Sequence, residues 1–204
     1  MMNTKAMFKL GYGLYVLTSK LGSQDNGCII NTVIQVTSNP NRISITVNKD
    51  NYTHDMIAQT GVFNVSVLTE QVSFDVFQRF GFQSGRDCNK FEGYMETKKA
   101  ENGVLYCTED TNAFISGKVI NQIDLGTHTM FIADVTECEV LSDAVSVTYD
   151  YYQKNIKPKP KKEESVVVGY RCTICGYIYE GEELPADYVC PICKHGAEVF
   201  EPVK

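Results

Sequence analysis

Two closely spaced cysteine pairs near the C-terminal end constrain the fold of this 204-residue chain more than any other feature. Each pair has the form C-x-x-C, fourteen residues separate the two, and the four residues are Cys172, Cys175, Cys190 and Cys193. Each pair can place two thiolates on one tight turn, and two facing turns complete a tetrahedron of sulfur ligands. The spacing therefore predicts a small metal-binding domain that holds either structural zinc or redox-active iron.

Charge divides the chain into three parts. Residues 1–152 hold 11 Lys and Arg against 17 Asp and Glu, residues 153–165 hold five Lys against two Glu, and residues 166–204 hold three against six. The middle segment, "QKNIKPKPKKEES", has no apolar periodicity and alternates Pro with Lys, which is typical of a solvated, partly extended linker. We therefore expect one full domain at 1–152, a linker at 153–165 and a small domain at 166–204.

Composition also limits function and location. Both expected domains are acidic and would repel phosphate backbones, so nucleic-acid binding is not expected. No apolar run approaches the roughly 20 residues needed to cross a bilayer, so we expect no membrane contact. The other cysteines stand singly, which favours a reducing compartment over a disulfide framework; they are Cys28, Cys88, Cys107 and Cys138. We expect a cytoplasmic protein.

Residues 1–152 carry mostly strand patterns. Alternating apolar and polar residues occur at 28–38, 42–48, 62–68, 113–123 and 127–141. Turn residues lie between these runs. So many strands predict a closed or nearly closed antiparallel barrel, and the fold class is mainly β. Two helical segments interrupt the strands, at 51–61, with Thr53 as N-cap and Gly61 just after the last turn, and at 73–80.

Three segments of this part carry candidate binding residues. In "NKDNYTH" (48–54), Lys49, Thr53 and His54 converge on a helix start, as a phosphate group requires, although such residues are more often simple caps. In "NTVIQV" (31–36), Asn31, Thr32 and Gln35 could hydrogen-bond the edge of a flat heterocycle, but strand alternation alone also places polar residues on one face. The third segment, "FGFQSGRDCNKF" (80–91), is a Gly- and Ser-punctuated loop that carries Arg86 and Lys90.

In order and wording, these segments resemble the flavin reductase-like family of FMN-binding split barrels, which includes flavoredoxins and NAD(P)H:flavin oxidoreductases. The resemblance covers residues 5–152 and is most specific in "NTVIQVTSNP", "VNKDNYTH", "FGFQSGRDCNKF" and "LGTHTMFIADV". It implies FMN as cofactor, NAD(P)H as substrate and a homodimer with FMN near the subunit interface. The cofactor-binding residues that it implies are Asn31, Thr32 and Gln35 toward the isoalloxazine, Lys49, Thr53, Arg86 and Lys90 toward the phosphate, and also Ile34, Asn48, His54 and Ser84.

The same resemblance singles out one histidine. His128 matches the histidine of the family's G-D-H-T motif, which lies near the flavin where a nicotinamide would stack, so the resemblance implies a catalytic role. Thr127 stands where the family has a carboxylate. Without the resemblance, a structural histidine on a strand would be the default interpretation.

Residues 168–203 resemble rubredoxin. The segment between the cysteine pairs is shorter than in most rubredoxins and closer to the short-loop domains appended to rubrerythrin-like proteins. Tyr188 stands where a Trp is common, and Lys194 occupies a position often held by Gly. The aromatic residues that would form the small core are Tyr170, Tyr177, Tyr179, Tyr188 and Phe200.

The combination of the two parts favours iron over zinc. A nicotinamide donates two electrons at once, whereas an iron–tetrathiolate centre passes one electron at a time. A flavin can accept two electrons and release them singly, so a flavin domain joined to an iron site converts two-electron into one-electron transfer. Zinc at the same cysteines would be redox-inert. The whole architecture resembles the high-molecular-weight rubredoxins of anaerobic bacteria. That resemblance implies NAD(P)H:rubredoxin oxidoreductase activity, with a flavodiiron protein that reduces oxygen or nitric oxide as acceptor. The alternatives are an FMN-binding protein whose structural zinc site serves as an interaction module, and a redox sensor.

Overall fold

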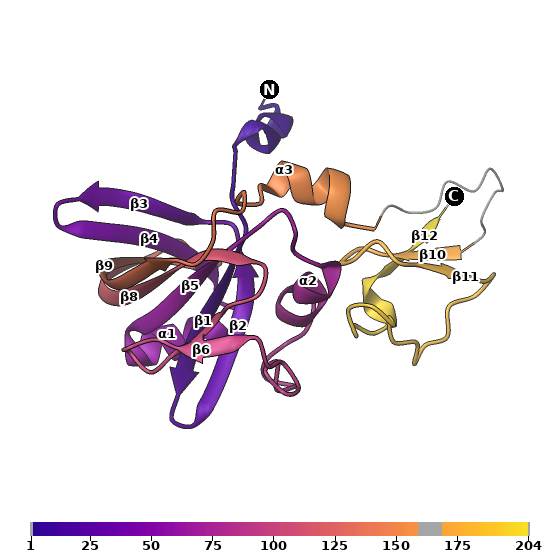
Figure 1. Ribbon diagram of the computed structural model, residues 1–204. Coiled ribbons are helices and arrows are strands. Elements are labelled where there is room, and N and C mark those ends of the chain that lie inside the picture. The colour runs from indigo at the N-terminus through magenta and orange to yellow at the C-terminus, as the bar shows by residue number, and fades with distance from the viewer. Residues whose placement is uncertain (1, 159–168, 204) are drawn as a thin grey trace.

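The structure of the protein, a computed structural model, describes residues 2–158 and 169–203. The second half of the predicted linker and the first residues of the predicted C-terminal domain lie outside the described residues. In the described part of the chain, a large β-structure lies next to a small C-terminal unit, and helix α2 lies between the two (Figure 1).

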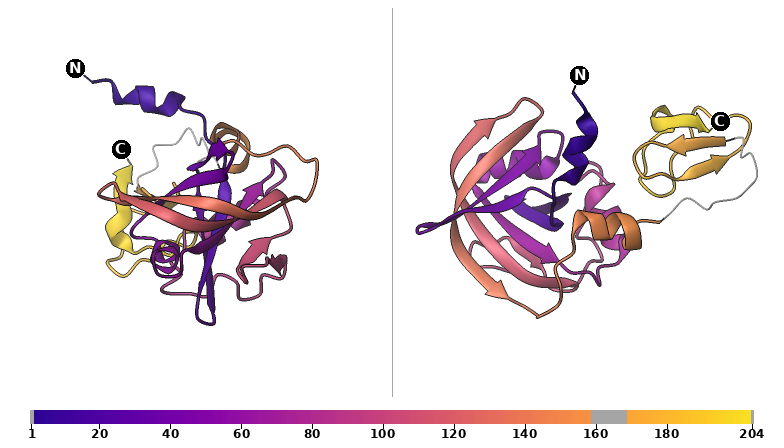
Figure 2. Two further views of the ribbon diagram at one scale, coloured as in Figure 1. Left: turned by 90° about the vertical axis from the view of Figure 1, so that its left-hand side faces the viewer. Right: turned by 90° about the horizontal axis from the view of Figure 1, so that it is seen from above.

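The large β-structure is one curved antiparallel sheet of seven strands. Its order is β2-β1-β5-β8-β9-β4-β3. The strands are β1 (Tyr15–Leu21), β2 (Gln24–Ile30), β3 (Val33–Ser38), β4 (Asn41–Asn48), β5 (Val62–Leu68), β8 (Thr111–Asp124) and β9 (His128–Val140). A two-stranded sheet of β6 (Thr97–Lys99) and β7 (Leu105–Cys107) lies beside it. Seen from above, the large sheet curls around its core as an open barrel (Figure 2), which confirms the mainly β prediction.

Strand alternation explains where the core lies. Ile43, Ile45 and Val47 on β4 are buried, and they pack with Phe63 on β5 and Phe131 on β9 in one apolar cluster. Because successive side chains on a strand point to opposite faces, the residues between these three on β4 point outward. The sheet therefore has a filled inner face and an outer face of mixed polarity.

The predicted strand 28–38 is two strands, and this correction has a clear reason. β2 pairs with β1 and β3 pairs with β4, so the chain passes between opposite edges of the sheet at residues 31 and 32. Strand β1 was not predicted from the sequence. Four consecutive residues of this seven-residue strand are buried, so both of its faces are covered and it lacks the alternation of buried and exposed residues that marks a half-exposed strand.

Helix α1 (Tyr52–Thr60) and helix α2 (Phe74–Gly81) confirm the two helical predictions. Gly61 ends α1 with a left-handed φ of 69°, as its position predicted. The predicted N-cap is wrong, however, because Asn51 is the extended residue before the first turn and Thr53 lies inside the helix. Asn51 takes this position through its extended backbone, and its side chain makes no capping hydrogen bond.

A helical segment leads from the barrel toward the C-terminal unit. A separate short helix, η1 (Thr4–Lys9), lies near the N-terminus. Helix α3 (Tyr149–Tyr151) continues directly into η2 (Tyr152–Ile156). The backbone is therefore helical on both sides of residue 152, the predicted end of the large domain. Tyr152 is buried in the barrel's second apolar cluster, and its ring centroid lies 4.4 Å from that of Phe77 on α2. The described structure of the barrel thus extends through the first residues of the predicted linker.

The C-terminal unit is a three-stranded antiparallel sheet in the order β11-β10-β12. Its elements are β10 (Gly169–Cys172), β11 (Ile178–Glu180), the short helix η3 (Ala197–Val199) and β12 (Phe200–Val203). Among residues 2–158 and 169–203, no helix has the length and apolar content to span a membrane.

Candidate functional site

The four paired cysteines form a compact cluster in the C-terminal unit. All four are buried, and their Sγ atoms lie within 4.8 Å of one another. Cys172 Sγ and Cys193 Sγ are 3.5 Å apart, as are Cys175 Sγ and Cys190 Sγ. Four thiols at this spacing fit a single tetrahedrally bound ion, and iron and zinc both accept such a donor set.

Backbone N–H groups point at the sulfur atoms of this cluster. Burial raises the pKa of Cys175 to about 11, although its thiol accepts a hydrogen bond from the Tyr177 backbone. At Cys190, burial raises the pKa, but hydrogen bonds from the backbones of Cys193 and Ile192 outweigh it and lower the pKa below its ordinary value. Such N–H···S bonds stabilise thiolates and tune a bound metal.

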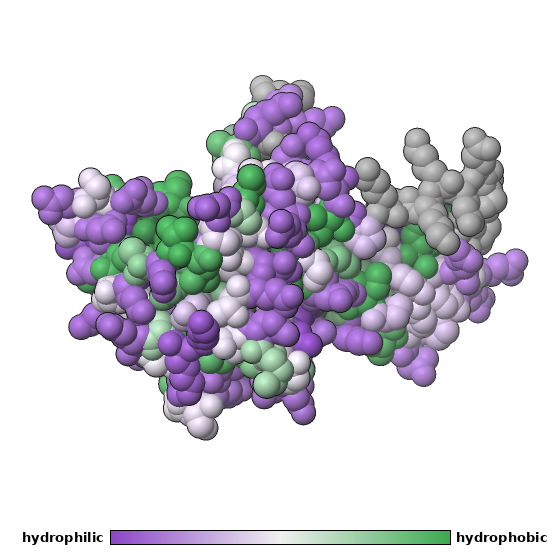
Figure 3. Space-filling model, viewed as in Figure 1, coloured by the Kyte–Doolittle hydropathy of each residue, from purple (hydrophilic) through white to green (hydrophobic). Residues whose placement is uncertain are grey.

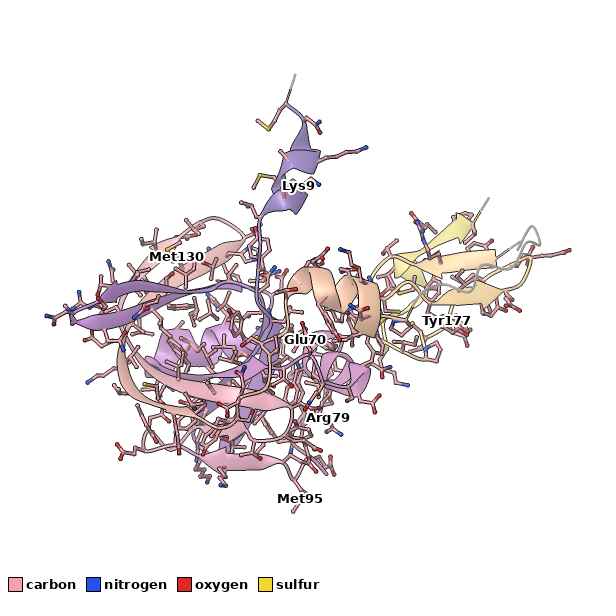
Figure 4. The ribbon with its side chains drawn as sticks, turned by 45° about the horizontal axis from the view of Figure 1, so that its top comes forward. Lys9, Glu70, Arg79, Met95, Met130 and Tyr177 are labelled. Carbon is pink, nitrogen blue, oxygen red and sulfur yellow. The ribbon has the colours of Figure 1, made fainter. Side chains whose placement is uncertain are left out.

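The aromatic residues of the C-terminal unit pack beside the cluster. The Tyr188 ring lies 4.6 Å from that of Tyr179 and 5.5 Å from that of Phe200. Its hydroxyl donates to the Tyr177 hydroxyl at 3.3 Å, so Tyr188 has a hydrogen-bond partner inside the unit. Tyr177 is labelled in Figure 4. Tyr170 is half-buried on β10, where its hydroxyl reaches the carbonyl of Glu182.

A polar cavity of about 160 Å³ lies where α1 begins and α2 ends. Three predicted cofactor-binding residues, Thr53, Ser84 and Lys90, line it. The first N–H groups of a helix have no partners within the helix, so the start of α1 can bind an anion there. The other lining residues are Asn26, Asp50, Asn51, Tyr52, Gly81, Phe82, Gln83, Gly85 and His195.

Thr53 is held by a neighbour that the sequence did not single out. Its side chain is fully buried, and its hydroxyl accepts a hydrogen bond from Asn26 Nδ2 at 3.1 Å. A Cβ atom on Gly85 would collide with the Asn26 side chain. The loop can therefore approach Asn26 this closely only because residue 85 has no side chain.

Lys90 is part of the cavity wall, yet its charge is already engaged. The side chain is 3% exposed, and Nζ donates to the carbonyls of Gly27 at 2.9 Å and Phe80 at 3.2 Å. Burial lowers the pKa of Lys90. Arg79 on α2 holds the same loop by donating to the carbonyls of Lys90 and Glu92 (Figure 4). Lys90 thus joins strand β2, helix α2 and the loop.

Arg86 and His54 meet at one carboxylate beside the cavity. Arg86 Nη2 donates to Asp55 Oδ2 at 2.6 Å, and His54 Nδ1 lies 3.0 Å from Asp55 Oδ1. Hydrogen bonds from His54 and Arg86 lower the pKa of Asp55. The Arg86 guanidinium also lies over the Tyr52 ring, 5.0 Å from its centroid. His54 Nε2 is 2.9 Å from Thr129 Oγ1, which ties α1 to β9.

A second group of predicted residues lies at the facing ends of β4 and β9. Asn48 pairs with His128 across the two strands, and Lys49 Nζ forms an ion pair with Asp124 at 2.7 Å. Thr127 Oγ1 lies 2.9 Å from His128 Nδ1. The hydroxyl of Thr127 therefore contacts the imidazole of His128 directly.

The third group lies on and just before the edge strand β3, and none of its residues lines the cavity. Asn31 is half-buried between β2 and β3, and the Thr32 hydroxyl donates to the carbonyl of Thr46 at 2.6 Å. Ile34 is 63% exposed on β3. Gln35 bonds Asn41 at the base of the β3–β4 turn. The predicted residues thus form one group at the cavity, one at the strand ends and one along β3.

Sequence reasoning missed Asn26, Tyr52, Phe82 and His195 as cavity residues. Tyr52 and Phe82 stand inside the predicted segments 48–54 and 80–91 and could have been found as neighbours of the predicted residues, whereas Asn26 and His195 depend on tertiary packing. A larger cavity of about 730 Å³ lies between the N-terminal segment and α3. It contains none of the predicted residues, and its aspartate, Asp150, is paired with Lys154.

Two protein families match this chain. The family described as flavin reductase like domain matches residues 7–159, and the family described as rubrerythrin, rubredoxin-like domain matches residues 170–201. The second match agrees with the expected similarity to rubrerythrin-type domains.

Individual relatives cover both parts. A high molecular weight rubredoxin of Moorella thermoacetica is 37% identical and covers 99% of this chain and all of that protein. A ferric-chelate reductase (NAD(P)H) of Archaeoglobus fulgidus is 38% identical and covers 81% of this chain and 97% of that protein. An NADH:FAD oxidoreductase of Streptomyces globisporus has a similar fold, with a TM-score of 0.62, 19% identity, and coverage of 72% of this chain and 91% of that one.

Proposed function

Because this chain belongs to the flavin reductase-like family and shares the two-part architecture of the high molecular weight rubredoxins, we propose that it is an NAD(P)H:rubredoxin oxidoreductase. In this role it is an NAD(P)H-dependent flavin oxidoreductase with FMN in the barrel and one iron at the four cysteines. FMN, when bound, takes up two electrons from a nicotinamide and releases them singly, which matches the one-electron capacity of iron–tetrathiolate.

One contact supports this proposal above all others. Phe82 lines the polar cavity and also packs against the four-cysteine cluster. A single side chain thus separates the two sites that the proposal couples. A structural zinc module would have no need for this proximity.

The barrel supplies suitable groups for a phosphorylated flavin. The first turn of α1 and Ser84 line the cavity, where they would hold the phosphate. Asp55 keeps Arg86 beside them through its 2.6 Å hydrogen bond. His128, held by Thr127, would contact the nicotinamide at the strand ends.

A second copy of the chain is proposed to complete the site. Ile34 of the third group lies on the outer face of the sheet, where Ile123 and Met130 also lie. Ile34 is 63% and Ile123 is 42% exposed. Figure 3 shows apolar residues on the surface in this part of the barrel, and Figure 4 labels Met130 there. A homodimer that covers this face would bury the exposed apolar area beside Thr32.

The acceptor is proposed to be a protein that takes single electrons, such as a flavodiiron oxygen or nitric oxide reductase. Val189, next to Cys190, is 53% exposed. This apolar side chain next to a buried thiol offers part of a small contact surface of the kind that weak redox encounters use.

Stopped-flow absorbance with NADH and NADPH tests the proposal. The iron-loaded, FMN-loaded chain is expected to show bleaching of both flavin and ferric absorbance. A chain that ends at residue 158 should retain flavin reduction and lose electron delivery to the acceptor; the cut must follow η2, because Tyr152 belongs to the barrel core. Ferric absorbance that persists while the flavin is reduced would contradict the proposal.

A further inference from the structure

One residue of the C-terminal unit reaches the polar cavity of the barrel. His195 lies two residues after the last cysteine of the cluster, and it lines the same cavity as Thr53, Ser84 and Lys90. The other residues that line this cavity come from the barrel. The cavity wall is therefore completed by a residue more than 100 positions away in the sequence.

The second cysteine turn fixes the orientation of His195. Its Nδ1 lies 3.1 Å from the carbonyl oxygen of Cys193, and because a carbonyl only accepts, Nδ1 carries the proton. The His195 carbonyl accepts from the Cys190 N–H at 2.8 Å, which anchors the backbone on its other side. Among the described residues, Nε2 of His195 has no recorded hydrogen-bond partner, so this atom is available to a ligand in the cavity.

Further contacts place the C-terminal unit along the same loop. A neighbouring cavity of about 520 Å³ is lined from the barrel by residues 82–84, Asp87 and Cys88, and from the C-terminal unit by Cys193, Lys194 and His195. On the other side of Phe82, Ile174 shares a cavity of about 240 Å³ with residues of α2 and η2. Figure 1 shows the unit next to α2, as these contacts require.

We propose that His195 is a binding residue for FMN, so that both domains build the cofactor site. Its Nε2 contacts the phosphate or the ribityl chain, beside the start of α1. This inference rests on the proposed function, since it assigns a further residue to the same cofactor. Because a ligand that contacts both domains binds more tightly when they are together, FMN also favours the arrangement in which the cysteine cluster lies against Phe82.

FMN titration of the full chain with zinc at the cysteines tests this proposal without enzymatic turnover, since zinc leaves the flavin fluorescence readable. His195→Ala is expected to bind FMN about tenfold more weakly than wild type at constant pH, the loss of one hydrogen bond to a charged group. His195→Gln, whose amide can replace Nε2, should recover part of the affinity. Riboflavin, which lacks the phosphate, distinguishes a phosphate contact from a ribityl contact.

Arg171→Ala is the matched control, because Arg171 is an exposed residue of the same unit that pairs with Glu201. Zinc content and the radius of gyration by X-ray scattering show whether each variant keeps its C-terminal unit folded. FMN should make the wild-type chain more compact and His195→Ala less so. Equal FMN affinity of wild type and His195→Ala would overturn this inference alone, whereas absence of FMN binding by wild type would overturn the proposed function with it.

Discussion

Gly176 and Lys194 occupy equivalent positions in the two cysteine turns, and both have left-handed backbones. Gly176 has a φ of 82° and donates its N–H to the Cys172 carbonyl at 2.9 Å. Lys194 has a φ of 61° and donates its N–H to the Cys190 carbonyl at 3.0 Å. The second turn therefore keeps the geometry of the first although a side chain stands where glycine is usual.

This equivalence predicts that Lys194→Gly stabilises the metal-loaded C-terminal unit. A non-glycine residue in the left-handed region costs about 1 kcal/mol, and glycine removes that cost. Lys194→Ala is the matched control, because it removes the same charge and keeps the Cβ atom. Thermal unfolding followed at the metal-to-sulfur absorption should give Lys194→Gly the higher midpoint, and equal midpoints for the two variants would contradict the prediction.

Removal of the metal should unfold the C-terminal unit and leave the barrel folded. The four cysteines are themselves the buried core of this unit, so without an ion little else holds it together. A chelator, or Cys190→Ser, is expected to abolish the ordered amide signals of residues 169–203 in NMR spectra. The signals of the barrel strands serve as the internal control. Ordered C-terminal signals in the metal-free chain would show that its tyrosines suffice as a core.

The outcome of each sequence-based prediction depended on whether neighbouring residues or residues far apart in the chain determine the feature. The cysteine cluster and the turn at Gly61 follow from a few neighbouring residues, and both are confirmed. The cap of α1 was placed two residues late, at Thr53, because several Asx and Thr residues compete there. The position of His195 could not be predicted, since it depends on how two separate parts of the chain pack.

Lys90, a predicted phosphate-binding residue, has a structural role in the barrel that its sequence motif does not indicate. Lys90→Met should lower the free energy of unfolding of the FMN-free barrel by about 2 kcal/mol, because the carbonyls of Gly27 and Phe80 lose their donor in a buried position. Urea unfolding measures this loss, with the exposed Lys98→Met as control. Unchanged stability together with weaker FMN binding would instead identify Lys90 as a cofactor ligand.

Gly85→Ala should disturb the polar cavity from within the loop. The new Cβ atom would displace the Asn26 side chain and break its hydrogen bond to Thr53. We expect FMN affinity to fall about tenfold, as for the loss of one or two hydrogen bonds in a closed site. Gly11→Ala is the control, since a Cβ atom there would have no heavy atom within 4 Å. Wild-type affinity in Gly85→Ala would show that Asn26 does not shape the cofactor site.

His128 is expected to act on the nicotinamide and not on the flavin. His128→Ala should slow flavin reduction by NAD(P)H about tenfold at unchanged FMN affinity, because one hydrogen-bonding group near the strand ends is lost. Thr127→Val should have a smaller effect in the same direction, since it removes the hydroxyl 2.9 Å from Nδ1, whereas Thr127→Ser keeps that hydroxyl and should behave as wild type. Single-turnover stopped-flow measurements separate the rate from FMN binding. Weaker FMN binding at an unchanged rate would place His128 against the flavin, and no change in either quantity would make it a structural residue of β9.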